Sequence, residues 1–194
     1  KDEFYECVCC KAIFRPKESL LNTQKEKERY ESHTNNSDDL GYQNFVSPIT
    51  NSILNEFKSD DLGLDFGCGK DSPIVKILQN NHYKISKYDP YFFDDKKLLE
   101  QKYDYIACCE VIEHFYNPKK EFELLKSLLK KDATLYLMTG IYRDNIDFSK
   151  WWYKNDLTHV FIFREKTFEW IKEEFGFKNM FIEKNFISFS NRKE

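Results

Sequence analysis

Apolar and polar residues follow different patterns in the first quarter of the chain and in the remainder. Residues 1–45 are rich in charge and have no sustained apolar period, which predicts an N-terminal extension with one or two helices. Beyond them, short apolar runs that stop at glycine or Asp-Pro alternate with segments whose apolar residues recur every three to four positions. We therefore expect one domain over residues 46–194.

Strands and helices alternate in this predicted domain. The short runs predict buried strands at 62–66, 83–88, 103–109 and 134–138, and a closing hairpin at 180–183 and 186–189. The periodic segments predict helices that begin near Ser47-Pro48, Ser72-Pro73, Pro118 and Thr167. Such alternation predicts an α/β fold with a mostly parallel sheet, right-handed crossovers and a terminal antiparallel hairpin.

The composition excludes some classes of partner and location but does not identify a function. The 194 residues carry 30 basic and 33 acidic side chains, so the net charge of −3 gives no reason to expect a nucleic-acid partner. No run of 18 apolar residues occurs, which predicts no membrane association. The six cysteines are clustered and no signal-like segment precedes them, so we expect reduced thiols and a cytoplasmic location.

The most specific local pattern is LDFGCG at 64–69, where a strand runs into a glycine turn and then a helix. Gly67 and Gly69 allow a tight turn and the close approach of a ligand to the backbone. The helix that follows offers unpaired N–H groups at the carboxyl end of the sheet. Asp89, at the end of the next strand, follows the turn by about twenty residues, which is the spacing expected of an acid that binds ribose hydroxyls. A strand–turn–helix without a ligand is the alternative.

Two cofactor classes use such a turn, and Asp65 separates them. A dinucleotide turn has a third glycine where this chain has Ser72, and an acid at position 65 would repel a pyrophosphate. An acid suits a ligand that brings a cation, as the amino group of S-adenosylmethionine does. The sequence therefore favours S-adenosylmethionine over NAD.

Together with YDYIACCEVIEH at 103–114, the glycine turn and Asp89 resemble the successive motifs of class I S-adenosylmethionine-dependent methyltransferases. The EVIEH stretch is similar to that of O-methyltransferases of ubiquinone biosynthesis. The resemblance covers about residues 46–194 and implies a Rossmann-like domain that binds S-adenosylmethionine and releases S-adenosylhomocysteine. The residues it implies at the cofactor are Asp65, Gly67, Cys68, Gly69, Asp89, Pro90, Cys109 and Glu110.

The chain departs from this family between its second and third predicted strands. Only thirteen residues separate Asp89 from Tyr103, too few for the usual helix, strand and helix. We therefore expect the family's third strand to be missing, together with the acid that it brings to the adenine. Asp94 and Asp95 are the substitutes that this segment offers.

Two segments offer groups for methyl transfer itself. Glu110, Glu113 and His114 have helical i, i+3, i+4 spacing. They could therefore act as a pair of proton-accepting side chains or bind a divalent metal. The alternative is that they begin a solvated helix. His159 follows an aromatic segment on the acceptor side, where the resemblance places an imidazole near the methyl group, and its pKa suits a general base. A histidine that only tethers the loop is the alternative. We predict His159, Glu113 and His114 as catalytic residues and no resident metal.

The extension contributes two further candidates. Cys7-x-x-Cys10 is half of a zinc ribbon, and tetrahedral zinc needs four ligands, so we expect zinc only if upstream residues complete the site. Related enzymes place a lid over the cofactor where residues 29–42 lie, and there Tyr30 and His33 could contact a ligand. A solvated linker is the alternative.

The sequence thus predicts an enzyme that transfers a methyl group from S-adenosylmethionine to an oxygen or nitrogen of a small-molecule or carrier-bound acceptor. The alternatives are a catalytically inert binding module with the same fold and, less well supported by Asp65 and Ser72, a nicotinamide-dependent oxidoreductase.

Overall fold

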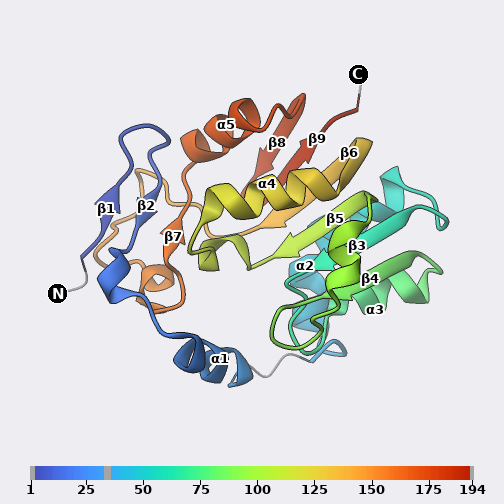
Figure 1. Cartoon of the computed structure of the whole chain (residues 1–194), viewed down its shortest axis with the longest axis horizontal. Helices are drawn as coiled ribbons and strands as arrows, with labels where there is room; N and C mark the ends of the chain where they lie inside the picture. Colours follow the sequence, from blue (N-terminus) through green and yellow to red (C-terminus); the bar gives the residue numbers. More distant parts are fainter. Residues whose placement is uncertain (1–2, 33–35, 193–194) are drawn as a thin grey trace.

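A six-stranded sheet forms the centre of the molecule (Figure 1), as seen in a computed structural model that describes residues 3–32 and 36–192. Its spatial order is β4-β3-β5-β6-β9-β8. The first four strands run parallel, and β9 pairs antiparallel with both β6 and β8. This confirms the predicted α/β fold with its terminal hairpin. The strands are β3 (Leu62–Phe66), β4 (Lys84–Tyr88), β5 (Tyr103–Cys109), β6 (Leu129–Met138), β8 (Asn179–Glu183) and β9 (Phe186–Ser190).

Helices cover both faces of the sheet because alternate strand residues point to opposite sides. Ile106 and Leu135 face one core, which α4 (Pro118–Leu128) and α5 (Glu165–Glu174) complete. Tyr105 and Tyr136 face the other, which α2 (Leu40–Glu56) and α3 (Pro73–Asn80) complete. Parallel strands buried on both faces explain why the predicted runs were almost continuously apolar.

Most element boundaries agree with the sequence, and α2 is the clear exception. We expected this helix to begin at Pro48, but it begins at Leu40, where the side chain of Asp39 caps it by accepting a hydrogen bond from the Tyr42 amide at 2.7 Å. Pro48 lies inside the helix, so the expectation that it starts one was wrong. The helix also spans the expected domain boundary between residues 45 and 46.

The segment between β4 and β5 is short, as predicted. Residues 90–102 are all described, and they contain only the 3₁₀ turn η2 (Lys96–Glu100) and one bridge between Asp89 and Phe93. The third strand of the family is therefore absent, and β4 ends the sheet on this side.

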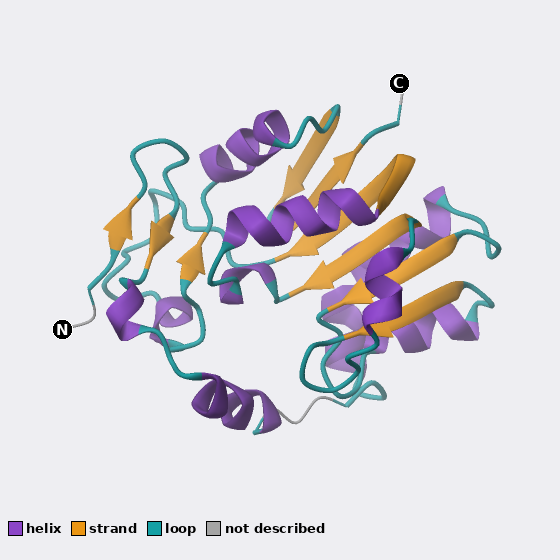
Figure 2. Ribbon diagram, in the orientation of Figure 1, coloured by secondary structure: helices purple, strands orange, loops and turns teal. Residues whose placement is uncertain are grey.

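The extension packs against the late part of the chain. Strands β1 (Tyr5–Glu6) and β2 (Ile13–Phe14) form a small sheet with β7 (Phe161–Ile162), visible beside the main sheet in Figure 2. The side chain of Arg15 is buried and donates to the backbone oxygens of His159 at 3.2 Å and Lys154 at 2.6 Å. After the 3₁₀ turn η1 (Lys17–Ser19), helix α1 (Thr23–Glu31) lies apart from the sheet. Within the described residues, no helix combines the length and apolar character needed to cross a bilayer.

Replacing Gly63 by alanine should destabilise the sheet. A Cβ on Gly63 would lie 2.2 Å from the buried ring of Tyr105 on the neighbouring strand, so one of the two must move. We expect Gly63→Ala to lower the free energy of unfolding by about 2–3 kcal/mol, measured by urea denaturation. In the double variant Gly63→Ala/Tyr105→Leu the two effects should be non-additive by about 1 kcal/mol or more. Strict additivity would mean that the contact between the new Cβ and Tyr105 does not cause the loss of stability.

Candidate active site

The glycine turn after β3 has a backbone that only glycine adopts easily. Gly67 and Gly69 have φ angles of +77° and +63°. A Cβ on Gly67 would lie 2.5 Å from a methyl carbon of Val111. The amides of Gly67 and Cys68 donate to the carbonyl of Tyr88, at 2.8 and 3.2 Å, and so hold the turn against the end of β4.

Asp89 holds the two strand ends together with its carboxylate. Oδ2 accepts a hydrogen bond from the Gly69 amide at 3.0 Å, and Oδ1 accepts from the amides of Tyr91 at 2.8 Å and Phe92 at 3.2 Å. Although Asp89 is only 7% exposed, it lines the cavity described below. Its carboxylate therefore sits where ligand hydroxyl groups could reach its remaining lone pairs.

Asp65 lies behind the turn and does not line the cavity. Its carboxylate accepts a hydrogen bond from Ser72 Oγ at 2.5 Å, and Ser72 Oγ in turn accepts from the Val75 amide and caps α3. Burial raises the pKa of Asp65 to about 7; the Ser72 hydrogen bond opposes this and the nearby charge of Asp89 adds to it. A cation that arrived nearby would favour the ionised form.

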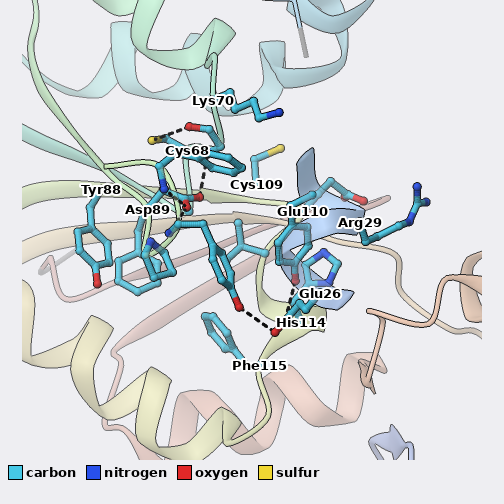
Figure 3. Close-up of a pocket in the computed structure, with 18 of the residues that line it drawn as sticks. Glu26, Arg29, Cys68, Lys70, Tyr88, Asp89, Cys109, Glu110, His114 and Phe115 are labelled. Atoms are coloured by element: carbon cyan, nitrogen blue, oxygen red, sulfur yellow. Dashed lines mark hydrogen bonds between the residues drawn. The ribbon is translucent and has the colours of Figure 1, made fainter. Parts of the chain in front are cut away.

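A cavity of about 1010 Å³ opens at the carboxyl ends of β3, β4 and β5 (Figure 3). This is the edge where ligands bind in open α/β sheets. Of the residues selected from the sequence, ten line it, whereas Asp65 and Glu113 lie behind its wall and His33 falls outside the described residues. The ten are Tyr30, Gly67, Cys68, Gly69, Asp89, Pro90, Cys109, Glu110, His114 and His159.

Glu110, which lines the cavity, and Glu113, which lies behind its wall, form a pair of acids. They do not share a helix face as expected, because Glu110 has a φ of +52° and only the 3₁₀ turn η3 (Ile112–His114) follows it. Glu113 is fully buried and accepts hydrogen bonds from the Tyr153 hydroxyl at 2.6 Å and from Thr139 Oγ1 at 2.9 Å. Burial raises the pKa of both acids, and the charge of Glu113 raises that of Glu110 further.

Two imidazoles lie next to this acid pair, with ring centroids 5.0 Å apart. His159 Nδ1 contacts the backbone oxygen of Tyr153 at 2.7 Å, and His114 Nδ1 contacts that of Thr158 at 2.8 Å. A carbonyl oxygen only accepts, so each Nδ1 carries a proton and the neutral ring has its lone pair on Nε2. Burial lowers the pKa of His159, which favours the neutral ring.

Glu113, His114 and His159 also form a potential cation site. Each offers one ligand atom, and these atoms lie within 4.8 Å of one another. The Nδ1 hydrogen bonds of the two imidazoles are of the kind that orient metal-bound histidines. The residues therefore fit a divalent cation as well as a proton acceptor.

Helix α1 covers the cavity from the opposite side. Glu26 is buried in this interface and accepts hydrogen bonds from the hydroxyls of Tyr30 and Tyr91, each at 2.9 Å. Arg29 forms an ion pair with Asp156 at 2.6 Å. Tyr30 was predicted from the sequence to contact a ligand and lines the cavity, whereas Glu26, Arg29 and Tyr153 were not predicted. Local patterns did not mark these residues, because each has a hydrogen-bond partner in a distant segment, at 65 positions for Glu26–Tyr91, 127 for Arg29–Asp156 and 40 for Tyr153–Glu113.

The cysteine pair of the extension forms a tight knuckle between β1 and β2. The amide of Cys7 donates to Ala12 O at 2.8 Å, the amide of Lys11 donates to Cys7 O at 3.0 Å, and Lys11 has a φ of +62°. Hydrogen bonds from the backbone, chiefly from Cys10, lower the pKa of the Cys7 thiol. Across the described residues, the only group of three or more clustered potential ligands is the Glu113 site, so this knuckle offers two of the four ligands that zinc needs.

Comparisons with known proteins agree with this geometry. A family model described as "Methyltransferase domain" matches residues 41–180. No curated protein sequence matches the chain. Among solved structures, similarity extends to the 1,6-didemethyltoxoflavin-N1-methyltransferase of Burkholderia thailandensis, with S-adenosylhomocysteine bound, at 10% identity and a TM-score of 0.59 over 98% of this chain and 100% of that one.

Two longer proteins are also similar. Human N-acetylserotonin methyltransferase, in complex with SAM, has 11% identity and a TM-score of 0.59 over 89% of this chain. A candidate O-methyltransferase of Nostoc punctiforme has 11% identity and a TM-score of 0.51 over 76% of it. The chain spans only 57% and 56% of these two proteins. At such identities the structures show a shared fold.

Neutralising Asp65 should stabilise the ligand-free protein most at high pH. The pKa of this buried acid is raised to about 7 from an ordinary 3.8, so its ionised form costs stability that grows as the pH rises from about 4 to 7. Asp65→Asn keeps an oxygen to accept the Ser72 hydrogen bond. We expect it to gain roughly 1–3 kcal/mol at pH 8 and clearly less at pH 5, measured by urea denaturation. An equal gain or loss at both pH values would show that the charge is not the cause.

Proposed function

This chain belongs to the methyltransferase domain family, and on that premise we propose that it transfers a methyl group from S-adenosylmethionine to an oxygen or nitrogen of a small-molecule acceptor. The observation that carries the proposal is the joint position of the strained glycine turn and Asp89 at one wall of the cavity. The similarity of this chain to structures with SAM or S-adenosylhomocysteine bound supports the same cofactor.

The residues of the turn suit each end of this cofactor. Gly67 and Gly69 let it approach the backbone where a Cβ would interfere, and Asp89 can accept hydrogen bonds from ribose hydroxyls. Asp65 acts from behind the turn, where its negative charge favours a ligand that carries an ammonium group. The cavity is at the upper end of the sizes that hold one drug-sized ligand, which leaves room for an acceptor beside the cofactor.

The acceptor's proton goes to His159 in this proposal. When bound, S-adenosylmethionine would supply an electrophilic methyl group, whose carbon–sulfur bond would break, with its electron pair left on sulfur, as the acceptor oxygen or nitrogen bonds to the carbon. His159 Nε2, held by the Nδ1 contact to Tyr153 and kept neutral by burial, takes the proton that the acceptor loses. Glu113 stands close enough to stabilise the resulting imidazolium by its negative charge.

The same cluster supports a second role, the binding of a divalent cation by Glu113, His114 and His159. A bound cation would lower the pKa of an acceptor hydroxyl without a protein base. Acceptors attached to a carrier fit either role, because Trp152, which lines the cavity, is 71% exposed.

Cofactor binding provides the first test. Calorimetry should show binding of S-adenosylhomocysteine and none of NAD. Asp89→Ala should weaken it by about 1–3 kcal/mol, or roughly 5–150-fold, because hydrogen bonds to a charged group are lost. Asp60→Ala is the control, since this exposed acid lies before β3 at the other end of the sheet. Binding of NAD instead would contradict the proposal, and an unchanged affinity in Asp89→Ala would mean that the ribose is held elsewhere.

Methyl transfer to a panel of phenols and amines, followed with labelled S-adenosylmethionine, tests the role of His159. If His159 is the base, His159→Asn should lower turnover by about 10²–10⁴-fold and leave cofactor affinity within about threefold. Activity that disappears on chelation and returns with a divalent cation would favour the second role. Full activity of the variant would exclude both.

A further inference from the structure

Glu26 lies at the centre of a group of aromatic side chains on the cavity wall that α1 supplies. It is only 8% exposed, and its two carboxylate oxygens accept hydrogen bonds from the hydroxyls of Tyr30 and Tyr91. Tyr116 lies beside this carboxylate, and its hydroxyl donates to the backbone oxygen of Leu21 at 3.0 Å. These four side chains all line the cavity, and we call Glu26, Tyr30, Tyr91 and Tyr116 the tyrosine cage.

Three separate segments supply the tyrosine cage. Glu26 and Tyr30 are four residues apart on α1 and so share one face of the helix. Tyr91 comes from the segment after β4, and its ring lies 5.5 Å from that of Tyr30 at an interplanar angle of 51°. Glu26 is the one buried residue of α1, so this helix faces the cavity with a carboxylate where a structural helix would bury an apolar side chain.

The carboxylate of the cage has only neutral partners. Within the described residues, no lysine, arginine or histidine forms an ion pair with Glu26. Arg29 on the same helix pairs with Asp156, and Figure 3 shows its side chain pointing away from Glu26. Burial raises the pKa values of the three tyrosines, so their hydroxyls stay neutral. A buried negative charge with neutral partners is stabilised most by a ligand that brings a cation.

The rest of the cavity lining also favours a cation. Among the described lining residues, acids outnumber lysine and arginine by six to three. The acids are Glu26, Asp39, Asp89, Glu110, Glu121 and Asp156, and the cations are Arg29, Lys70 and Lys120. Asp94 and Asp95, which the sequence suggested for the adenine, are exposed and do not line the cavity. An excess of one sign of charge in a cleft attracts ligands of the opposite sign.

His114 connects the tyrosine cage with the proposed base. Its ring lies edge-on to that of Tyr30, with 5.3 Å between the centroids, and its centroid is 5.0 Å from that of His159. The cage and the base are therefore close but separate parts of one cavity. A single acceptor can place a charged group in the cage and its nucleophilic atom at His159.

We propose that the methyl acceptor carries an ammonium group and that the tyrosine cage binds it, with Glu26 opposite the charge and the rings around it. Cations are attracted to the faces of aromatic rings, and a carboxylate adds charge-assisted hydrogen bonds. The proposal rests on the proposed function and narrows its acceptor to molecules whose ammonium group lies several bonds from the methylated oxygen or nitrogen. The cage residues determine specificity and take no part in the transfer step.

The test uses pairs of compounds that differ in a single charged group. Tyramine is compared with 4-propylphenol, and choline with 3,3-dimethylbutan-1-ol; in each second compound carbon replaces the ammonium nitrogen. Calorimetry on the chain saturated with S-adenosylhomocysteine should show that the ammonium compound of at least one pair binds about tenfold or more tightly than its neutral counterpart. The proposal is overturned if neither ammonium compound is preferred.

Three variants relate this preference to the cage. Glu26→Gln removes the charge and keeps the shape, so it should lower the affinity for the preferred ammonium compound about tenfold and change that for the neutral compound little. Tyr116→Leu removes an exposed ring and should lower it about threefold. Glu28→Gln, an exposed position of the same helix outside the cavity lining, should keep the wild-type preference.

The affinity for S-adenosylhomocysteine separates this proposal from the proposed function. It should be nearly the same in Glu26→Gln as in the wild type. An unchanged ammonium preference in Glu26→Gln would overturn the present proposal alone, and weaker binding of S-adenosylhomocysteine in that variant would mean that the cage serves the cofactor instead. Failure of the wild-type chain to bind S-adenosylhomocysteine would overturn the proposed function, and this proposal with it.

Discussion

The ligand-binding end of this molecule depends on the carboxylate of Asp89. Its two oxygens accept hydrogen bonds from three backbone amides, one in the glycine turn after β3 and two in the segment after β4. These two segments are twenty residues apart in sequence, and the carboxylate adds to the hydrogen bonds from the Gly67 and Cys68 amides to the Tyr88 carbonyl that also join them. The charge of the aspartate compensates for backbone groups that neither strand can satisfy. The cavity wall, the turn and the start of the shortened β4–β5 connection all follow from this one arrangement.

Burial of acids is the second feature that shapes the site. Asp65, Glu110 and Glu113 all have raised pKa values because they lie in poorly solvated surroundings. Perturbed acids of this kind cluster at functional sites, where they await a compensating charge. S-adenosylmethionine carries two cationic groups, so such surroundings favour it over an anionic dinucleotide.

The sequence was sufficient for the central sheet, and ten of the residues selected from it line the cavity. Strands such as Leu62–Phe66 and Lys84–Tyr88 were predicted because each is a short apolar run ended by glycine or Asp-Pro, signals that lie within a few residues. The start of α2 was missed because Asp39, a cap within a polar segment, outweighed the proline that usually begins a helix. The position of Asp65 behind the turn, and the walls supplied by Glu26 and Arg29, depend on packing between distant segments. Local patterns do not encode such packing.

The loss of the third strand also changes what the sheet offers to other molecules. With β4 at the end of the sheet, its outer backbone groups form an edge that another strand could extend. The strand is only five residues long and carries Lys84 and Lys87, of which Lys87 covers the ring of Phe93 at 3.9 Å. Short length and lysines are the means by which natural sheets resist edge-to-edge association. Because the short β4–β5 connection leaves β4 at the end of the sheet, the length and the lysines of this strand limit aggregation.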